Sequence, residues 1–158
     1  EIASCLVGSE MCIRDRLLVM DSYVELYKGG IVPVADFVNM PYDRDILVRV
    51  IVKKTAAHYS YKSVRISKTD FPVLTCAAAL TQEGVQAAVG ARPAKAALVK
   101  DAEQLATLPM TAEKAQAFAE YAAGLLPTET NPRGSAAYRT HLIKVLTARC
   151  LTELGGKA

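Results

Sequence analysis

The stretch FPVLTCAAALTQEGVQAAVGA, residues 71–91, contains the two apolar segments that decide the fold. Phe71 to Thr81 is a nearly continuous apolar run, and Val85 to Ala91 follows it after the Gln82-Glu83-Gly84 turn. Short apolar runs bounded by turn residues are typical of buried strands. Tyr59 to Ser67 alternates weakly just ahead of them. Together the three segments predict a small, mostly antiparallel sheet.

Two helices are expected after this sheet. Thr111 can cap a helix over about Ala112 to Leu125, with its apolar stripe at Ala115, Phe118, Ala119, Ala122 and Leu125. A last helix starts after Gly134-Ser135 and stops at Gly155-Gly156, with an apolar side formed by Tyr138, Leu142, Leu146, Cys150 and Leu154. That side should cover the sheet. Strands followed by helices favour an α+β fold, because parallel βαβ units would need helices between the strands.

The upstream part predicts a separate hairpin. Tyr23 to Lys28 and Ile31 to Val34 flank the Gly29-Gly30 pair, which is typical of a hairpin turn. Ile46 to Lys53 is rich in β-branched residues and is expected to be a strand. The segment between them is rich in turn residues, so we expect a domain boundary near Asp43 to Asp45.

Composition excludes several classes of protein. With 158 residues, 51% of them hydrophobic and 22% charged, the chain is long enough for one ordinary core. The net charge of +3 is mild and the basic residues are scattered, so nucleic-acid binding, which needs a clustered basic face, is disfavoured. No run approaches the roughly 20 apolar residues that a membrane span needs. We expect a soluble protein with no membrane partner.

The first sixteen residues are set apart from the fold. Leu6 to Arg16, LVGSEMCIRDR, looks like the in-frame translation of a transposon-type sequencing adapter, so residues 1–16 are expected not to be native. A secretion signal is disfavoured because the apolar stretch is short and lacks a basic start. Only Cys76 and Cys150 then remain, without metal-ligand spacing. We therefore expect no metal site, no disulfide framework and a cytoplasmic location.

No catalytic constellation is visible in the residues alone. His58 and His141 lie in unlike contexts, and Gly29-Gly30 does not open a phosphate-binding loop. The most unusual cluster is Tyr61 to Phe71, YKSVRISKTDF, where aromatic, basic and hydroxyl side chains precede a buried strand. Lys62 in this cluster can face an anionic or aromatic ligand. The alternative is a solvated edge strand whose lysines discourage pairing with other sheets.

Three ordered motifs carry a resemblance to a known family. Residues 61–71 resemble the Y-K-x-x-R-x-S-x-x-D-F segment of the C-terminal domain of molybdenum hydroxylase flavoproteins, the family of xanthine dehydrogenase and carbon monoxide dehydrogenase. Val89-Gly90-Ala91-Arg92-Pro93 resembles the V-G-A segment of that family, which a proline follows. Residues 133–139, RGSAAYR, resemble its R-G-S-x-x-Y-R helix start. Three motifs in the family's order are more specific than any one of them.

The resemblance implies a domain organisation. Residues 17–44 would be the C-terminal remnant of the FAD-binding domain, with its last hairpin at Val24 to Phe37. Residues 45–158 would be the flavoprotein C-terminal domain. The glycine-rich segments that hold the FAD pyrophosphate in the family have no match in this sequence. We therefore expect that this chain by itself binds FAD poorly and is inactive.

The resemblance also implies a function within an oxidoreductase. In the family, a molybdenum cofactor oxidises the substrate, iron-sulfur clusters relay electrons to FAD, and the flavin passes them to NAD or another acceptor. The implied partners are a molybdopterin-binding subunit and an iron-sulfur subunit. The substrate and the acceptor stay open, as does whether the flavoprotein is a separate subunit. A noncatalytic α+β protein-interaction module is the alternative function.

Four residues are implied to bind the cofactor, and none to be catalytic or to hold a metal. Lys62 aligns with a lysine beside the isoalloxazine ring, where its charge would favour reduced, anionic flavin. Leu47 aligns with an apolar residue against the ring, and an ordinary strand role for it stays open. Tyr61 and Asp70 complete the set, although Asp70 also suits a turn.

The remaining motif residues have structural interpretations. Arg65 is expected to pair with Asp70. Ser135 caps the last helix, and Tyr138 is expected to anchor it in the core. Arg133 and Arg139 are expected at a solvated helix end, with a partner-facing role as the alternative.

Overall fold

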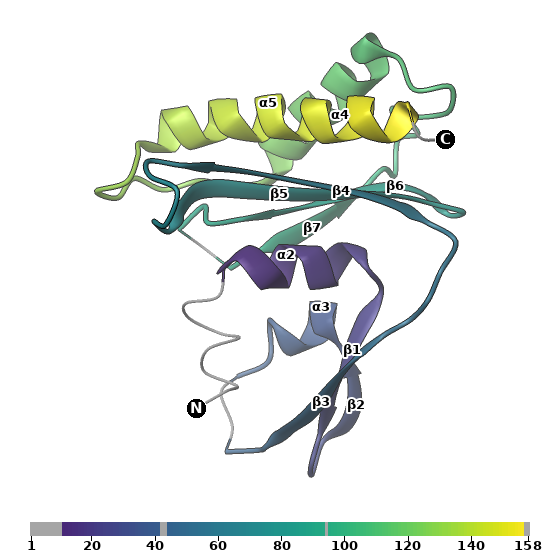
Figure 1. Cartoon of the computed structure of the whole chain (residues 1–158), viewed down its shortest axis with the longest axis vertical. Helices are drawn as coiled ribbons and strands as arrows, with labels where there is room; N and C mark the ends of the chain where they lie inside the picture. Colours follow the sequence, from purple (N-terminus) through teal and green to yellow (C-terminus); the bar gives the residue numbers. More distant parts are fainter. Residues whose placement is uncertain (1–10, 42–43, 94, 157–158) are drawn as a thin grey trace.

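The computed structural model describes residues 11–41, 44–93 and 95–156, which form two antiparallel sheets and two helical layers (Figure 1). The elements in chain order are α2 Met11–Val19, β1 Ser22–Leu26, β2 Gly30–Pro33, α3 Val34–Phe37, β3 Leu47–Val52, β4 His58–Arg65, β5 Pro72–Thr81, β6 Gly84–Gly90, β7 Ala97–Lys100, α4 Ala112–Leu125 and α5 Ala136–Gly155. The predicted α+β fold, an antiparallel sheet with C-terminal helices, is confirmed.

The larger sheet has the strand order β4-β5-β6-β7, and every neighbouring pair is antiparallel. The three predicted segments form β4, β5 and β6. The turn between β5 and β6 contains Gly84 at φ +123°, a conformation that only glycine adopts without strain. The sequence analysis missed β7, because its four residues give too short a pattern to register.

Both faces of this sheet are buried, which explains why β5 is a continuous apolar run. Cys76 and Ala78 belong to the core beneath α4 and α5, together with Phe118. Ala77 and Ala79 belong to a second core on the opposite face, against which α2 packs. A strand covered on both faces loses the alternation of apolar and polar residues that marks a half-exposed strand. In Figure 1 the sheet accordingly lies between the α4–α5 layer and α2.

The two C-terminal helices begin where their caps predict. The Lys114 amide donates to Thr111 Oγ1 at 3.3 Å, and the Tyr138 amide donates to Ser135 Oγ at 3.2 Å. These bonds satisfy amides that lack a partner inside the helix. Two members of the predicted stripes are exposed, Leu125 at 54% and Tyr138 at 45%, because each lies at an end of its helix. The expectation that Tyr138 anchors the core is therefore wrong.

The smaller sheet has the order β2-β1-β3. β1 and β2 form the predicted hairpin, with Gly30 at φ +70° in its turn. β3 pairs antiparallel with β1, so the predicted strand after residue 45 joins the hairpin's sheet. Asp45 fastens this region to the hairpin, because its carboxylate accepts from the Lys28 and Gly29 amides at 2.8 to 3.1 Å. The domain boundary expected near Asp43 to Asp45 stays a prediction, and Asp43 lies outside the described residues.

Helix α2 contains six of the residues that the sequence analysis set aside, and residues 1–10 of that segment lie outside the described part of the chain. Arg14 and Asp15 are buried against the sheet. Arg14 Nε and Asp15 Oδ2 have no hydrogen-bond partner among the described residues. Burial raises the pKa of Asp15 to about 6, although the nearby Thr75 hydroxyl and, to a smaller extent, the Arg16 amide and charge lower it. Arg14 and Asp15 thus bury charged groups whose hydrogen bonding is incomplete, which costs stability.

Two further findings concern the described residues. None of their helices is long and apolar enough to cross a bilayer. Among these same residues, no group of three or more His, Cys, Asp or Glu side chains is placed to hold a metal ion.

Candidate functional site

The cluster that the sequence singled out lies on β4, the outer strand of the larger sheet. Successive side chains of a strand point to opposite faces. Tyr61 packs on the α2 side, within the same apolar cluster as Leu47. Its ring lies 3.8 Å from the guanidinium carbon of Arg16, measured to the ring centre. Lys62 points the other way, toward helix α5.

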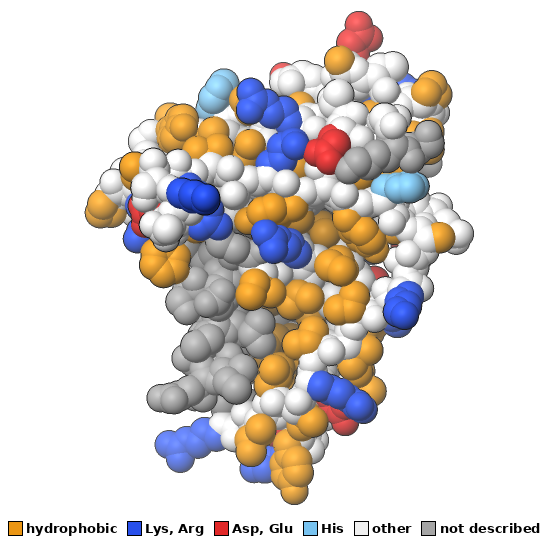
Figure 2. All heavy atoms as spheres, viewed as in Figure 1, with side chains coloured by type: hydrophobic (Ala, Val, Ile, Leu, Met, Phe, Trp, Pro, Cys, Tyr) orange, Lys and Arg blue, Asp and Glu red, His pale blue; other side chains and the backbone are white. Residues whose placement is uncertain are grey.

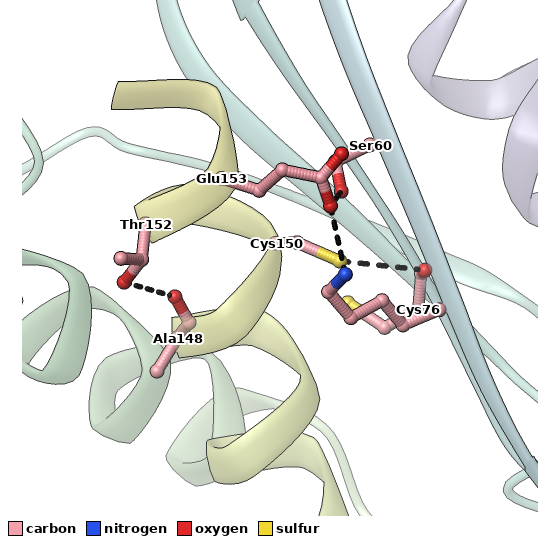
Figure 3. Close-up of polar contacts among 7 residues, drawn as sticks. Ser60, Cys76, Ala148, Cys150, Thr152 and Glu153 are labelled. Carbon is pink, nitrogen blue, oxygen red and sulfur yellow. Dashed lines mark hydrogen bonds and ion pairs between the residues drawn. The ribbon is translucent and has the colours of Figure 1, made fainter. Parts of the chain in front are cut away.

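Lys62 belongs to a polar cluster that joins β4 to α5. Its ammonium lies 2.7 Å from Glu153 Oε2, and Ser60 Oγ donates to the same oxygen at 2.9 Å. Figure 3 shows Glu153 reaching from α5 toward Ser60. The hydrogen bond to Glu153 raises the pKa of Lys62, so the ammonium is charged at neutral pH. The side chains of Lys62 and Glu153 are 32% and 39% exposed, which places the pair at the rim of the core.

Two thiols lie beneath this cluster. Cys150 Sγ donates to the Cys76 carbonyl oxygen at 3.8 Å (Figure 3). Cys76 Sγ lies 3.5 Å from Thr147 Oγ1. Both cysteines are fully buried. Contact with Cys150 and burial raise the pKa of Cys76, which keeps that thiol protonated. A buried, protonated thiol packs as a small apolar group and is a poor nucleophile.

Asp70 holds the turn between β4 and β5. Its Oδ1 accepts from the Phe71 amide at 2.7 Å, and Arg65 Nη1 donates to its carbonyl oxygen at 2.5 Å. Arg133 lies 3.9 Å from the same carboxylate and 5.2 Å from the Phe71 ring centre. The contacts of Asp70 therefore support a role in holding this turn, which was one of its two expected roles. The expected pairing of Arg65 with Asp70 is made to the backbone rather than to the carboxylate.

The third motif contains a buried residue that the sequence analysis misplaced. Arg139 is 1% exposed, so the expectation of a solvated or partner-facing side chain is wrong. Its guanidinium donates to three carbonyl oxygens, those of Val73 at 3.0 Å, Glu129 at 2.6 Å and Gly134 at 2.5 Å, and to Asn131 Oδ1 at 2.5 Å. Arg139 precedes Leu142 and Ile143 by three and four residues, and this helical spacing was the signal for the buried face.

The four predicted cofactor residues do not converge on one cavity. Leu47 and Tyr61 share an apolar cluster, Lys62 lies on the opposite face of β4, and Asp70 lies in the turn at the strand's end. Because β4 is an outer strand, the long Lys62 side chain lies beside an open edge of the sheet. The apolar pair therefore packs against the core on one side of the sheet, and the cation lies on the other side.

A cavity of about 620 Å³ lies elsewhere, between the two sheets. Its lining includes Tyr23, Lys53 and Gln86, and none of the four predicted residues. Two of the polar groups there are engaged with other residues of the chain: Lys53 Nζ donates to Tyr23 Oη at 2.8 Å, and Gln86 Nε2 donates to the Val19 carbonyl at 3.2 Å. The cavity is therefore not the site that the motifs indicate.

Comparison with protein families identifies the class. Residues 59–154 match the model of the CO dehydrogenase flavoprotein C-terminal domain, and the chain belongs to this family. The match contains all three motifs, so the resemblance to molybdenum hydroxylase flavoproteins is confirmed. No curated protein sequence matches the chain.

Solved structures share the fold. Quinoline 2-oxidoreductase from Pseudomonas putida 86 superposes with a TM-score of 0.77 at 19% identity, over 98% of this chain and 60% of that one. Carbon monoxide dehydrogenase from Hydrogenophaga pseudoflava, which lacks the Mo-pyranopterin moiety of the molybdenum cofactor, gives 0.77 at 18% identity, over 92% and 56%. The reconstituted CO dehydrogenase from Oligotropha carboxidovorans gives 0.73 at 19% identity, over 92% and 57%. The chain thus spans about 60% of the length of the structures it resembles.

Proposed function

We propose that the full-length protein to which this chain belongs is the FAD-binding, electron-transfer component of a molybdenum hydroxylase-like oxidoreductase. The observation that carries the proposal is the family match over residues 59–154, with its three motifs in order. In this proposal, residues 17–44 end the FAD-binding domain, and residues 1–16 are foreign to the protein. Electrons would arrive from iron-sulfur clusters and leave to NAD or another acceptor in the cytoplasm. A molybdopterin-binding subunit and an iron-sulfur subunit would be its partners.

The residues fit one part of FAD. Leu47 and Tyr61 are apolar and aromatic side chains of the kind that contact an isoalloxazine ring, and both are partly buried against the core on the α2 side of the larger sheet. Lys62 supplies a positive charge on the other face of β4, at the outer edge of the sheet, and Asp70 fixes the turn at the end of this strand. The bound flavin supplies the electron-transfer chemistry, and the chain positions and electrostatically biases it. The sequence holds no glycine-rich phosphate loop, so the pyrophosphate would be held by upstream residues.

An absorbance spectrum tests the proposal. The gene's upstream sequence is recovered from the source DNA, and the full reading frame is expressed and purified. We expect a two-banded flavin spectrum, and we expect Lys62→Ala to weaken or shift it because the charge at the flavin edge is lost. A folded, colourless protein would contradict the proposal.

One observation favours a noncatalytic interaction module as the second candidate function. The smaller sheet exposes the apolar side chains Tyr27, Ile31, Ile46 and Val48. Figure 2 shows hydrophobic side chains gathered over the lower part of the molecule, where Figure 1 places this sheet. Exposed apolar patches of this kind mark contact surfaces. A colourless full-length protein that forms a stable complex with another chain would support this function.

A further inference from the structure

The charge of Lys62 is paired with a carboxylate that the family motifs do not include. Glu153 lies 91 positions further along the chain, in the last turn of α5. Its Oε2 accepts from both Lys62 Nζ and Ser60 Oγ. Lys62 and Ser60 are two residues apart on β4, and therefore on the same face. One carboxylate oxygen of Glu153 thus accepts hydrogen bonds from two side chains of β4.

From these contacts we propose that Glu153 is a positioning residue of the flavin site, which holds the Lys62 ammonium at the open edge of β4 and offsets part of its charge. The inference rests on the proposed function. It adds a residue that none of the three motifs contains.

The position of the carboxylate is fixed from two sides. Cys150, one turn earlier on α5, is fully buried against Cys76 of the central strand β5 and keeps this end of the helix on the sheet. Ser60 is 6% exposed, so its hydroxyl is an internal donor rather than a mobile surface group. Glu153 therefore holds Lys62 at a definite place and does not follow it as a free counter-ion.

The sign of the effect follows from the charges. A positive charge near the isoalloxazine ring favours the reduced, anionic flavin and makes the midpoint potential more positive. A carboxylate bonded to that charge weakens this effect. Removing the carboxylate should therefore shift the potential upward, and removing the ammonium should shift it downward.

The experiment measures the flavin midpoint potential in the full-length, flavin-loaded protein by spectroscopic redox titration. We expect a positive shift in Glu153→Gln and a negative shift in Lys62→Met. We expect the Glu153→Gln shift to disappear in the Lys62→Met background, because Glu153 acts through Lys62. Glu120→Gln, on the exposed side of α4, is the matched control and should leave the potential unchanged. An equal positive shift in both backgrounds would overturn the inference.

A charge swap separates an electrostatic role from a structural one. The double variant Lys62→Glu with Glu153→Lys restores an ion pair but reverses the charge on β4. We expect its melting temperature to match that of the native protein while its midpoint potential becomes more negative. A swap that restores the native potential would show that the pair only fastens α5 to β4, and the inference would fall.

The outcomes also separate this inference from the function it rests on. If the full-length protein binds no flavin, both the proposed function and the role of Glu153 are contradicted. If the flavin midpoint potential changes in Lys62→Met but not in Glu153→Gln, only the proposed role of Glu153 is contradicted. If neither variant changes the potential, the flavoprotein function stands and both residue assignments fall.

Discussion

Two buried charged residues show how differently the two halves of the chain fit their fold. Arg139, on the buried face of α5, donates four hydrogen bonds and is 1% exposed. Asp15, on α2, is 0% exposed, and its Oδ2 has no partner among the described residues. Burying a charge is costly unless hydrogen bonds compensate it. The burial of Arg139 is therefore compensated by hydrogen bonds, whereas that of Asp15 is compensated only in part.

The contrast extends to the surrounding sequence. In the C-terminal half, turn residues, helix caps and apolar stripes all indicate the same structure, as is typical of a sequence selected for its fold. In α2, by contrast, the charged residues Arg14 and Asp15 lie on the side of the helix that is buried against the sheet. This is what we expect if residues 11–16 replaced native residues that were apolar or small.

The largest effect is expected from Arg139. Arg139→Met should lower the free energy of unfolding by about 4 kcal/mol, because it leaves buried carbonyl groups without donors. Urea denaturation monitored by circular dichroism measures it. Arg139→Lys is the control, and it should recover only part of the loss because an ammonium cannot match the planar guanidinium. A loss below about 1 kcal/mol in Arg139→Met would remove the contrast between the two halves.

A change of opposite sign is expected at Asp15. Asp15→Ala should raise the free energy of unfolding by about 3 kcal/mol at pH 7, the energy that corresponds to the raised pKa of this carboxyl. The same urea titration measures it. Asp36→Ala, an exposed aspartate on α3, is the control and should stay within about 0.5 kcal/mol. Destabilisation by Asp15→Ala would mean that the contacts of the buried carboxylate compensate its burial, and the contrast with Arg139 would not hold.

The same residue predicts a dependence on pH. The carboxyl has a pKa of about 6 in the folded chain and 3.8 as its ordinary value, so between these values the folded state binds more protons. The contribution of Asp15 to stability therefore falls as pH rises from about 4 to about 6. We expect the gain from Asp15→Asn to be small at pH 4 and larger at pH 7, measured as urea midpoints. A gain independent of pH would contradict a buried, titrating carboxyl.

A smaller effect is expected at the start of α5. Ser135→Ala should cost about 1 kcal/mol, because the Tyr138 amide loses its acceptor. Thermal unfolding measures it. Thr152→Ala, in an exposed position within α5, removes a hydroxyl without removing a cap and serves as the control.

The smallest effect concerns the Lys62–Glu153 pair. Glu153→Gln should change the free energy of unfolding by less than about 1 kcal/mol, since both side chains are more than 30% exposed and solvent screens them. Chemical denaturation of this chain measures it without any cofactor. A larger loss would indicate that the pair is mainly structural.

The sequence predicted those parts of the fold that depend on local signals. The Gln82-Glu83-Gly84 turn, the Thr111 and Ser135 caps and the two glycines at the end of α5 mark boundaries that neighbouring residues determine. The partner of Lys62 could not be found this way, because 91 positions separate it from Glu153. The opposite orientation of Tyr61 and Lys62, in contrast, follows from the strand period alone. The burial of Arg139 could have been predicted from its spacing of three and four residues from Leu142 and Ile143. It was missed because charged residues are usually exposed.

The contacts of Arg139 also have a kinetic consequence. The guanidinium joins the loop at residues 129–134 to β5, and within that loop the amides of Asn131 and Gly134 bond to each other's carbonyl oxygens at 3.1 and 3.0 Å. Opening of the loop therefore requires that the hydrogen bonds of Arg139, a buried residue of α5, break. The amide protons of the loop should exchange with solvent at the slow rate of the core, although surface loops usually exchange much faster. We therefore expect the exchange rates of the amides in residues 129–134 to follow the unfolding of the C-terminal half, although the loop lies at the surface.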